Sequence, residues 1–262
     1  FGGGRAVGVV CGLVLCLLSG VGRSAEAFDW EADTVRAFER LPVQDAGRVK
    51  PVATYARFTL LRFSGRPTLR DEGGAHSATE WLMDCLFRPE RARAHKVFLI
   101  ESPEVLDALG LPRESGRDRY AYADLEPVRN ELLELAAQYA QKPGARSSFE
   151  AQLLRLAHNV REFEALSGTP RLAGHLALFP NPDPAAREWL TAAEAAETGG
   201  DASRRLDPLS RLLSDMTASA DRPERFHAAL VDFAGRVESA ARDRGEYRAI
   251  GLEVLYYGLE VF

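Results

Sequence analysis

Hydrophobic positions between residues 51 and 65 follow the period of an α-helix. After Pro51, apolar side chains and one threonine recur at intervals of three and four residues, at Val52, Tyr55, Ala56, Thr59, Leu60 and Phe63. This spacing places them on one face of a helix. Pro51 suits the first turn of that helix, and Gly65-Arg66-Pro67 would end it. The segment therefore predicts an amphipathic helix with one face on a hydrophobic core.

Two longer helical patterns lie in the middle of the chain. The first carries Val128, Leu132, Leu135 and Tyr139, and the second carries Phe149, Leu153, Leu156, Val160 and Phe163. Asp124 is the expected cap of the first helix, and Ser147 with Glu150 forms a capping-box pattern for the second. Lys142-Pro143-Gly144 separates the two helices. Their heptad-like spacing predicts a central antiparallel helical hairpin.

The remaining patterns favour a mainly α fold. Further helices are expected at 33–40, 78–87 (with Ser77 and Glu80 as a capping box), 103–109, 185–198, 208–219 and 223–242, the last capped by Asp221. Residues 70–76 are expected to form a polar loop, and Gly199-Gly200-Asp201 a linker. Strand patterns occur only at 96–100 and 171–180. The prediction is a helical domain with a central antiparallel hairpin and at most two short strands.

The N-terminal segment has the pattern of a secretory signal. Arg5 precedes an apolar run over residues 6–21, and Ala25 and Ala27 give a small-x-small cleavage pattern. At about 1.5 Å per residue the run spans roughly 24 Å, less than the roughly 30 Å of a bilayer's hydrocarbon core. Residues 1–27 are interpreted as a signal peptide, with an uncleaved membrane anchor as the alternative. A helical domain over 28–244 and a juxtamembrane segment over 245–262 would follow.

Charge and cysteine content narrow the class of partner. Without residues 1–27, which contain two arginines and one glutamate, the chain has a net charge of −6. An acidic chain lacks the basic surface that nucleic-acid binding requires. Cys85 is the single cysteine after residue 27, so an intramolecular disulfide is excluded there. An exported protein of this kind fits the bacterial periplasm, in association with the inner membrane.

Signatures of known chemistry are missing from the sequence. It contains no GxSxG, HExxH, P-loop, GxGxxG or CxxCH motif. Its five histidines show no ligand spacing, at His76, His95, His158, His175 and His227. The acidic clusters Asp29-Glu31-Asp33 and Glu194-Glu197-Asp201 are consistent with solvated segments. We therefore assign no catalytic residue, no metal ligand and no bound cofactor from the sequence.

Two cations occupy an unusual place before the helix that starts near Pro51. Proline forces Lys50 into an extended conformation, so Arg48 and Lys50 lie just ahead of a helix N-terminus. The helix dipole favours anions there and disfavours cations. Either an internal carboxylate such as Asp45, or an external anionic ligand or partner, would relieve the cost. Arg48 and Lys50, with Arg57 further along, are the candidates for binding an anion or a partner.

The stretch LPVQDAGRVKPVATYAR, residues 41–57, resembles a segment in the exported domain of System II cytochrome c biogenesis proteins, the ResB/CcsA-like fused cytochrome c synthases. The matching positions are Leu41, Pro42, Val43, Gln44, Gly47, Arg48, Lys50, Pro51, Thr54, Ala56 and Arg57. Trp81-Leu82, the central helical hairpin, LALFP at 176–180 and the terminal GLEVLYYGLEVF are also similar to that family. The last of these resembles the lead into a membrane helix.

This resemblance implies a function in cytochrome c maturation, with departures. The family's tryptophan-rich haem-handling segment and its membrane histidines have no counterpart, since Trp30, Trp81 and Trp189 are isolated. No catalytic residue is carried over. The expectation is a non-catalytic accessory or scaffold domain that contacts apocytochrome c and a membrane-embedded synthase component, with haem present only through the wider complex. The alternative is a scaffold subunit of another membrane-bound respiratory or photosynthetic complex; a hydrolase is disfavoured because no nucleophile constellation is present.

Overall fold

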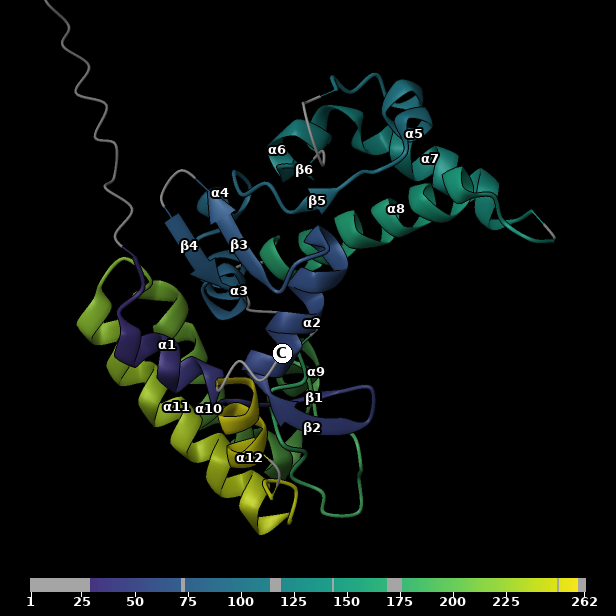
Figure 1. The fold of residues 1–262 in the computed structure, drawn as a ribbon. Helices are drawn as coiled ribbons and strands as arrows, with labels where there is room; N and C mark the ends of the chain where they lie inside the picture. The colour runs from purple at the N-terminus through teal and green to yellow at the C-terminus, as the bar shows by residue number, and fades with distance from the viewer. Residues whose placement is uncertain are drawn as a thin grey trace, which may run out of the picture.

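The computed structural model describes residues 29–71, 74–113, 119–142, 144–168, 176–248 and 250–258. The protein is mainly helical, as the sequence predicts, with a few short two-stranded sheets (Figure 1). The predicted signal segment 1–27 lies outside the described residues, as do residues 259–262 at the end of the juxtamembrane segment. Within the described ranges, no helix combines the length and the apolar character needed to span a membrane.

Helix α2 (Val52–Ser64) lies at the centre of the molecule (Figure 1). It packs against α1 (Ala32–Glu39), α3 (Ala78–Phe87) and α8 (Ser148–Ser167). The face predicted from the sequence is the buried one, although Tyr55 is only half-buried. Gly65 ends the helix in a left-handed conformation with φ of 68°, which a glycine adopts without strain.

Helices α7 (Arg129–Ala140) and α8 pack against each other, and the Tyr139 and Phe149 rings meet beside their connection. Helix α8 begins with the predicted capping box, in which Ser147 accepts from the Glu150 backbone and Glu150 accepts from the Ser147 backbone. The predicted Asp124 cap of α7 is wrong. Pro127 lies in a break, so α6 (Tyr122–Leu125) and a 3-10 turn (Glu126–Val128) precede α7, and Asp124 accepts from the Ala121 backbone within α6.

Helices α10 (Gly200–Ala218) and α11 (Pro223–Asp243) form the other large helical pair, and α1 packs along α11. Two predictions here are wrong. Gly200 opens α10 instead of forming a linker, so this helix starts eight residues before Pro208 and contains it. Residue Arg222, not Asp221, is the N-cap of α11, and Pro223 takes the first helical position.

The described residues contain six short strands in three antiparallel pairs, so the expectation of at most two strands is wrong. The pairs are β1 (Pro42–Asp45) with β2 (Arg48–Pro51), β3 (Thr68–Asp71) with β4 (Gly74–Ser77), and β5 (Phe98–Leu99) with β6 (Arg119–Tyr120). The second pair replaces the polar loop expected at 70–76. Strands of two to four residues are too short to show a period.

The segment 176–191 differs most from its prediction. The strand expected at 171–180 is reduced, in its described part, to single bridges of Ala177 with Gln44 and of Phe179 with Leu190. The helix expected at 185–198 shortens to α9 (Ala192–Glu197), because the bridge to Phe179 holds Leu190 in an extended conformation and Thr191 forms the N-cap of the helix. Figure 1 shows this segment as a long connection below the β1–β2 hairpin.

The remaining helices are α4 (Pro89–Ala92), α5 (Pro103–Ala108) and α12 (Ile250–Gly258). Helix α3 begins at the predicted Ser77–Glu80 capping box. Helix α12 packs on β2 and α2, which brings the last described helix to the segment that carries the family resemblance.

Candidate functional site

The β1–β2 hairpin contains most of the residues that match the resembled family, and its geometry follows from its sequence. The two-residue turn consists of Ala46 and Gly47, both with positive φ, of 51° and 74°. Turns of this kind match the twist of the two strands, and glycine is favoured in them. At the open end Pro42 pairs with Pro51, and because neither has an N–H, the next bond runs from the Val52 N–H to the Leu41 carbonyl at 2.8 Å. The hairpin thus leads directly into α2.

Both cations ahead of α2 have carboxylate partners. Lys50 Nζ lies 2.7 Å from Asp45 Oδ2, the internal carboxylate considered from the sequence. Arg48 pairs instead with Glu253 of α12, and the same carboxylate accepts a hydrogen bond of 3.3 Å from the Thr54 hydroxyl. Thr54 stands in the first turn of α2, which has no acidic residue and no side-chain cap of its own. Glu253 therefore supplies a negative charge close to the positive end of the α2 dipole.

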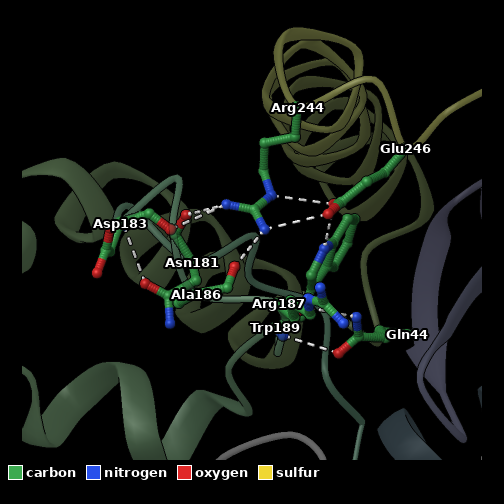
Figure 2. Close-up of polar contacts among 8 residues, drawn as sticks. All are labelled: Gln44, Asn181, Asp183, Ala186, Arg187, Trp189, Arg244 and Glu246. Carbon is green, nitrogen blue, oxygen red and sulfur yellow. Dashed lines mark hydrogen bonds and ion pairs between the residues drawn. The ribbon is translucent and has the colours of Figure 1, made fainter.

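Gln44 ties the hairpin to the 181–189 segment. Its side-chain amide donates to the Arg187 carbonyl and accepts from the Trp189 backbone N–H, both at 2.8 Å (Figure 2). Its backbone N–H donates to the Ala177 carbonyl at 3.0 Å. One glutamine thus fixes two points of a connection that has no regular secondary structure.

Arg244, just beyond α11, holds the other side of the same segment. Its guanidinium donates to the carbonyls of Asn181, Asp183 and Ala186 at 2.9, 3.1 and 2.6 Å (Figure 2). It also pairs with Glu246, which accepts a 2.7 Å hydrogen bond from the Trp189 indole. Only 12% of the Arg244 side chain is exposed. We call the contacts of Gln44, Arg48, Thr54 and Arg244 with these C-terminal segments the hairpin joint.

A groove of about 510 Å³ runs between the hairpin, α2 and α8. The hairpin contributes Asp45 and Lys50; its other charged and aromatic lining residues are Tyr55, Phe58, Arg62, His158, Arg161 and Glu162. Burial raises the pKa of the Tyr55 phenol, so Tyr55 faces the groove as a neutral hydroxyl. Arg57 is half-buried on α2 and is not among the lining residues. Of the three candidate cations, only Lys50 reaches this groove.

A second polar cluster is buried around Asp84 on α3. Asp84 accepts from the Trp30 indole at 2.9 Å and contacts His95 Nε2 at 3.0 Å and Arg91 Nε at 3.3 Å. The Arg88 guanidinium stacks on Trp30, 3.4 Å from the ring centroid, and burial lowers the pKa of Arg88 to about 10. Each carboxylate oxygen of Asp84 has a partner, so the cluster fastens the N-terminal segment to α3 and α4.

The described part of the chain contains no group of three or more His, Cys, Asp or Glu residues arranged to hold a metal ion. A haem pocket would need an axial ligand within an apolar enclosure. His158 faces the groove with 65% of its side chain exposed, but Lys50, Arg62 and Arg161 surround it and Glu162 lies 3.4 Å away. These residues do not fit an enclosed haem site, and His175 lies outside the described residues.

The β1–β2 hairpin and the first turn of α2 contain most of the residues singled out from the sequence: Pro42, Gln44, Gly47, Arg48, Lys50, Pro51 and Thr54. Of these, Gln44, Arg48 and Thr54 take part in the hairpin joint. Sequence reasoning did not identify Glu253, the partner of Arg48 and Thr54, or Arg244, which binds the carbonyls of Asn181, Asp183 and Ala186. Glu253 lies 199 positions from Thr54, and a glutamate in an apolar terminal helix is the one signal in the sequence that could have indicated an ion pair there. Neither Asp29 nor Asp33 forms a carboxylate pair, because they bind Arg91 and Arg36 respectively.

No family model matches the chain, and no curated protein matches it at a significant level.

Proposed function

We propose that this chain is a periplasmic, inner-membrane-associated scaffold domain of System II-type cytochrome c maturation. It would hold apocytochrome c or the membrane-embedded synthase component in place and would carry out no bond chemistry itself. The proposal rests on the resemblance of residues 41–57 to the exported domain of that family. The observation that supports a scaffold is the use of those residues: Gln44, Arg48 and Thr54 all bind other segments of the chain.

The hairpin joint suggests how such a scaffold would work. Residues 245–262 are the proposed juxtamembrane segment, and α12 within it is attached to the start of α2 through Arg48, Thr54 and Glu253. A partner bound to the domain would then keep a fixed orientation relative to the membrane. In this proposal α7 and α8 form the antiparallel helical hairpin that gives the domain its rigid arm.

Deleting the gene in its host tests the assignment. We expect membrane c-type cytochromes to lose their covalently bound haem, seen by haem staining of denaturing gels, while the apocytochrome polypeptide is still synthesised. Retention of covalent haem together with loss of one other respiratory or photosynthetic complex would overturn the assignment and favour a scaffold of that complex.

Complementation of the deletion then tests the joint. Arg48→Ala with Lys50→Ala should reduce covalent haem, because α12 loses its ion pair and the groove loses its lysine. The matched control is Arg204→Ala with Arg236→Ala, which removes two cations from exposed pairs within α10 and α11. Equal activity of the two double variants would contradict a role for the hairpin joint in the proposed function.

A further inference from the structure

The groove of about 510 Å³ between the β1–β2 hairpin, α2 and α8 is bounded by one face of each helix. Three residues from α2 and three from α8 line it at the three- and four-residue spacing of a helix face: Tyr55, Phe58, Arg62, His158, Arg161 and Glu162. The groove is open to solvent, because most of these side chains are exposed or half-buried. Its volume falls within the roughly 300–1,000 Å³ of sites that bind small molecules.

The charged side chains of this groove do not cancel. Lys50 pairs with Asp45 at 2.7 Å. Arg62 pairs with Glu162. Arg161 is a third cation, so three basic side chains face two carboxylates, and the groove has a formal charge of +1 when its histidine is neutral. The whole chain has a net charge of −5. The groove is therefore a positive site on an acidic protein, and its charge matches a ligand with one negative charge.

Arg161 is the cation that remains without a partner. The glutamate that follows it, Glu162, is paired with Arg62, and Glu164 accepts a hydrogen bond of 2.9 Å from Arg129. Arg161 itself is exposed and forms no ion pair or hydrogen bond with any residue in the described ranges. An arginine in this state offers two parallel N–H groups to an incoming carboxylate.

Phe58 gives the groove an apolar surface on the α2 side. Its side chain is 52% exposed, and it is the only aromatic residue among the large apolar side chains that are exposed in the described part of the chain. Tyr55, one turn earlier, adds no negative charge, because burial raises the pKa of its phenol. An aromatic surface on one wall and a cation on the other suit a ligand with an apolar body and one anionic end.

The charge of the groove also selects the kind of anion. A carboxylate carries one negative charge and fits the planar guanidinium group through two hydrogen bonds. A phosphate monoester carries about −1.5 to −2 at neutral pH. Its additional charge would find no free cation here, because Lys50 and Arg62 are already paired with carboxylates of the protein.

We infer that this groove binds a small monocarboxylic acid with an aromatic body, whose carboxylate pairs with Arg161 and whose ring packs on Phe58. Arg62 supports this binding indirectly, because it holds Glu162 and so keeps that carboxylate from competing for Arg161. The inference does not depend on the assignment to cytochrome c maturation, since it uses none of the contacts of the hairpin joint.

The test titrates the full chain with phenylpropionate, phenylbutyrate and naphthylacetate, followed by isothermal titration calorimetry. We expect at least one of these acids to bind with a Kd below about 1 mM, and its primary amide, which has the same shape but no charge, to bind about tenfold more weakly. Acetate, which lacks the ring, and phenyl phosphate, which carries more charge, should both bind more weakly than the best acid. Failure of all three acids to bind, or tighter binding of phenyl phosphate, would overturn the inference.

Substitutions then locate the site. Arg161→Ala should weaken binding of the best acid about tenfold and leave binding of its amide unchanged, so that the two ligands bind equally. Phe58→Ala should weaken binding of both. The matched control is Arg155→Ala, which removes another exposed arginine of α8 that does not line the groove, and it should bind the acid as the wild type does. Equal losses in Arg155→Ala and Arg161→Ala, or a preference for the acid that persists in Arg161→Ala, would contradict the inference. Because all three side chains are exposed, circular dichroism should show that the variants keep the fold.

Discussion

The hairpin joint lies at the start of α2, and Asn159 of α8 lies against the end of the same helix. The two regions differ in how completely their polar groups are hydrogen-bonded. In the joint, Gln44 uses both ends of its amide, and Arg244 spreads its guanidinium over three carbonyls and a carboxylate. Asn159 on α8 has a buried Oδ1 without a hydrogen-bond partner among the described residues. The difference separates polar groups that hold distant segments together from a buried group that is only partly satisfied.

The comparison also corrects a common inference from sequence. Arg48 and Lys50 attract attention because two cations precede a helix N-terminus, yet both are paired within the chain. Asn159 and Gln152 attract none, because asparagine and glutamine are ordinary inside an amphipathic helix. Whether a buried polar group has its hydrogen-bond partners is revealed only by the three-dimensional arrangement.

The largest effect is expected from Arg244→Ala. Three backbone carbonyls and Glu246 would lose a partner that is almost fully buried, so we expect the free energy of unfolding to fall by about 3 kcal/mol. Urea denaturation followed by circular dichroism measures this. Arg236→Ala, which removes an exposed partner of Asp232 on α11, should cost less than about 0.5 kcal/mol. Similar losses for the two variants would show that the joint does not stabilise the fold.

Gln44→Ala should have the next largest effect. It removes a donor from the Arg187 carbonyl and an acceptor from the Trp189 N–H, so we expect a loss of about 1–2 kcal/mol and a change in the Trp189 environment. Denaturation and tryptophan fluorescence report the two consequences. Gln138→Ala on the exposed face of α7 serves as the control. An unchanged emission spectrum in Gln44→Ala would argue against the hydrogen bond between Gln44 and the Trp189 N–H.

Acid sensitivity is expected from Glu164 on α8. The hydrogen bond from Arg129 lowers the pKa of Glu164, and the bond from the Tyr122 hydroxyl lowers it further; Tyr122 in turn has its pKa raised to about 12, chiefly by burial. Because the pKa of Glu164 is lower in the folded state, ionised Glu164 stabilises the fold. This contribution is fully present above the unfolded pKa near 4.5 and is lost as the pH falls through the pKa of folded Glu164. Glu164→Gln should therefore flatten the decline of stability below pH 5, measured by urea denaturation at several pH values. An unchanged pH profile would contradict this.

A double-mutant cycle of Arg48→Ala and Glu253→Ala should give a smaller coupling, of about 0.5 kcal/mol, since 61% of the Arg48 side chain is exposed. The coupling should decrease between 0.05 and 0.5 M NaCl because salt screens exposed charges. A coupling that is independent of salt would indicate that the pair is held in a less solvated environment than its exposure implies.

Asn159→Ala should change stability least, by less than about 0.5 kcal/mol. It loses one long hydrogen bond but also removes the buried oxygen that has no partner. Measured beside Gln44→Ala, it compares two amides that differ in whether both ends are satisfied. A loss as large as that of Gln44→Ala would mean that Asn159 is a structural group and would remove the contrast between the two regions.

What could be predicted from the sequence depended on how local each feature is. The capping boxes at Ser77–Glu80 and Ser147–Glu150 and the buried face of α2 were predicted correctly, because each is encoded within a few turns of helix. The prediction of a helix over 185–198 was wrong for its first half, where the bridge of Leu190 to Phe179 overrides helix propensity. The short strands were not predicted, because two to four residues carry no measurable period.

The sequence by itself determined the helical class, most helix boundaries and the unusual character of residues 41–57. Only the tertiary structure decided what those residues do, since Thr54 and its partner Glu253 are 199 positions apart and no local rule connects them. The same holds for Asn159, which is set apart from other asparagines only by what surrounds it. Backbone conformation is largely a local property of the chain, whereas the satisfaction of a buried polar group depends on whichever distant segments fold against it.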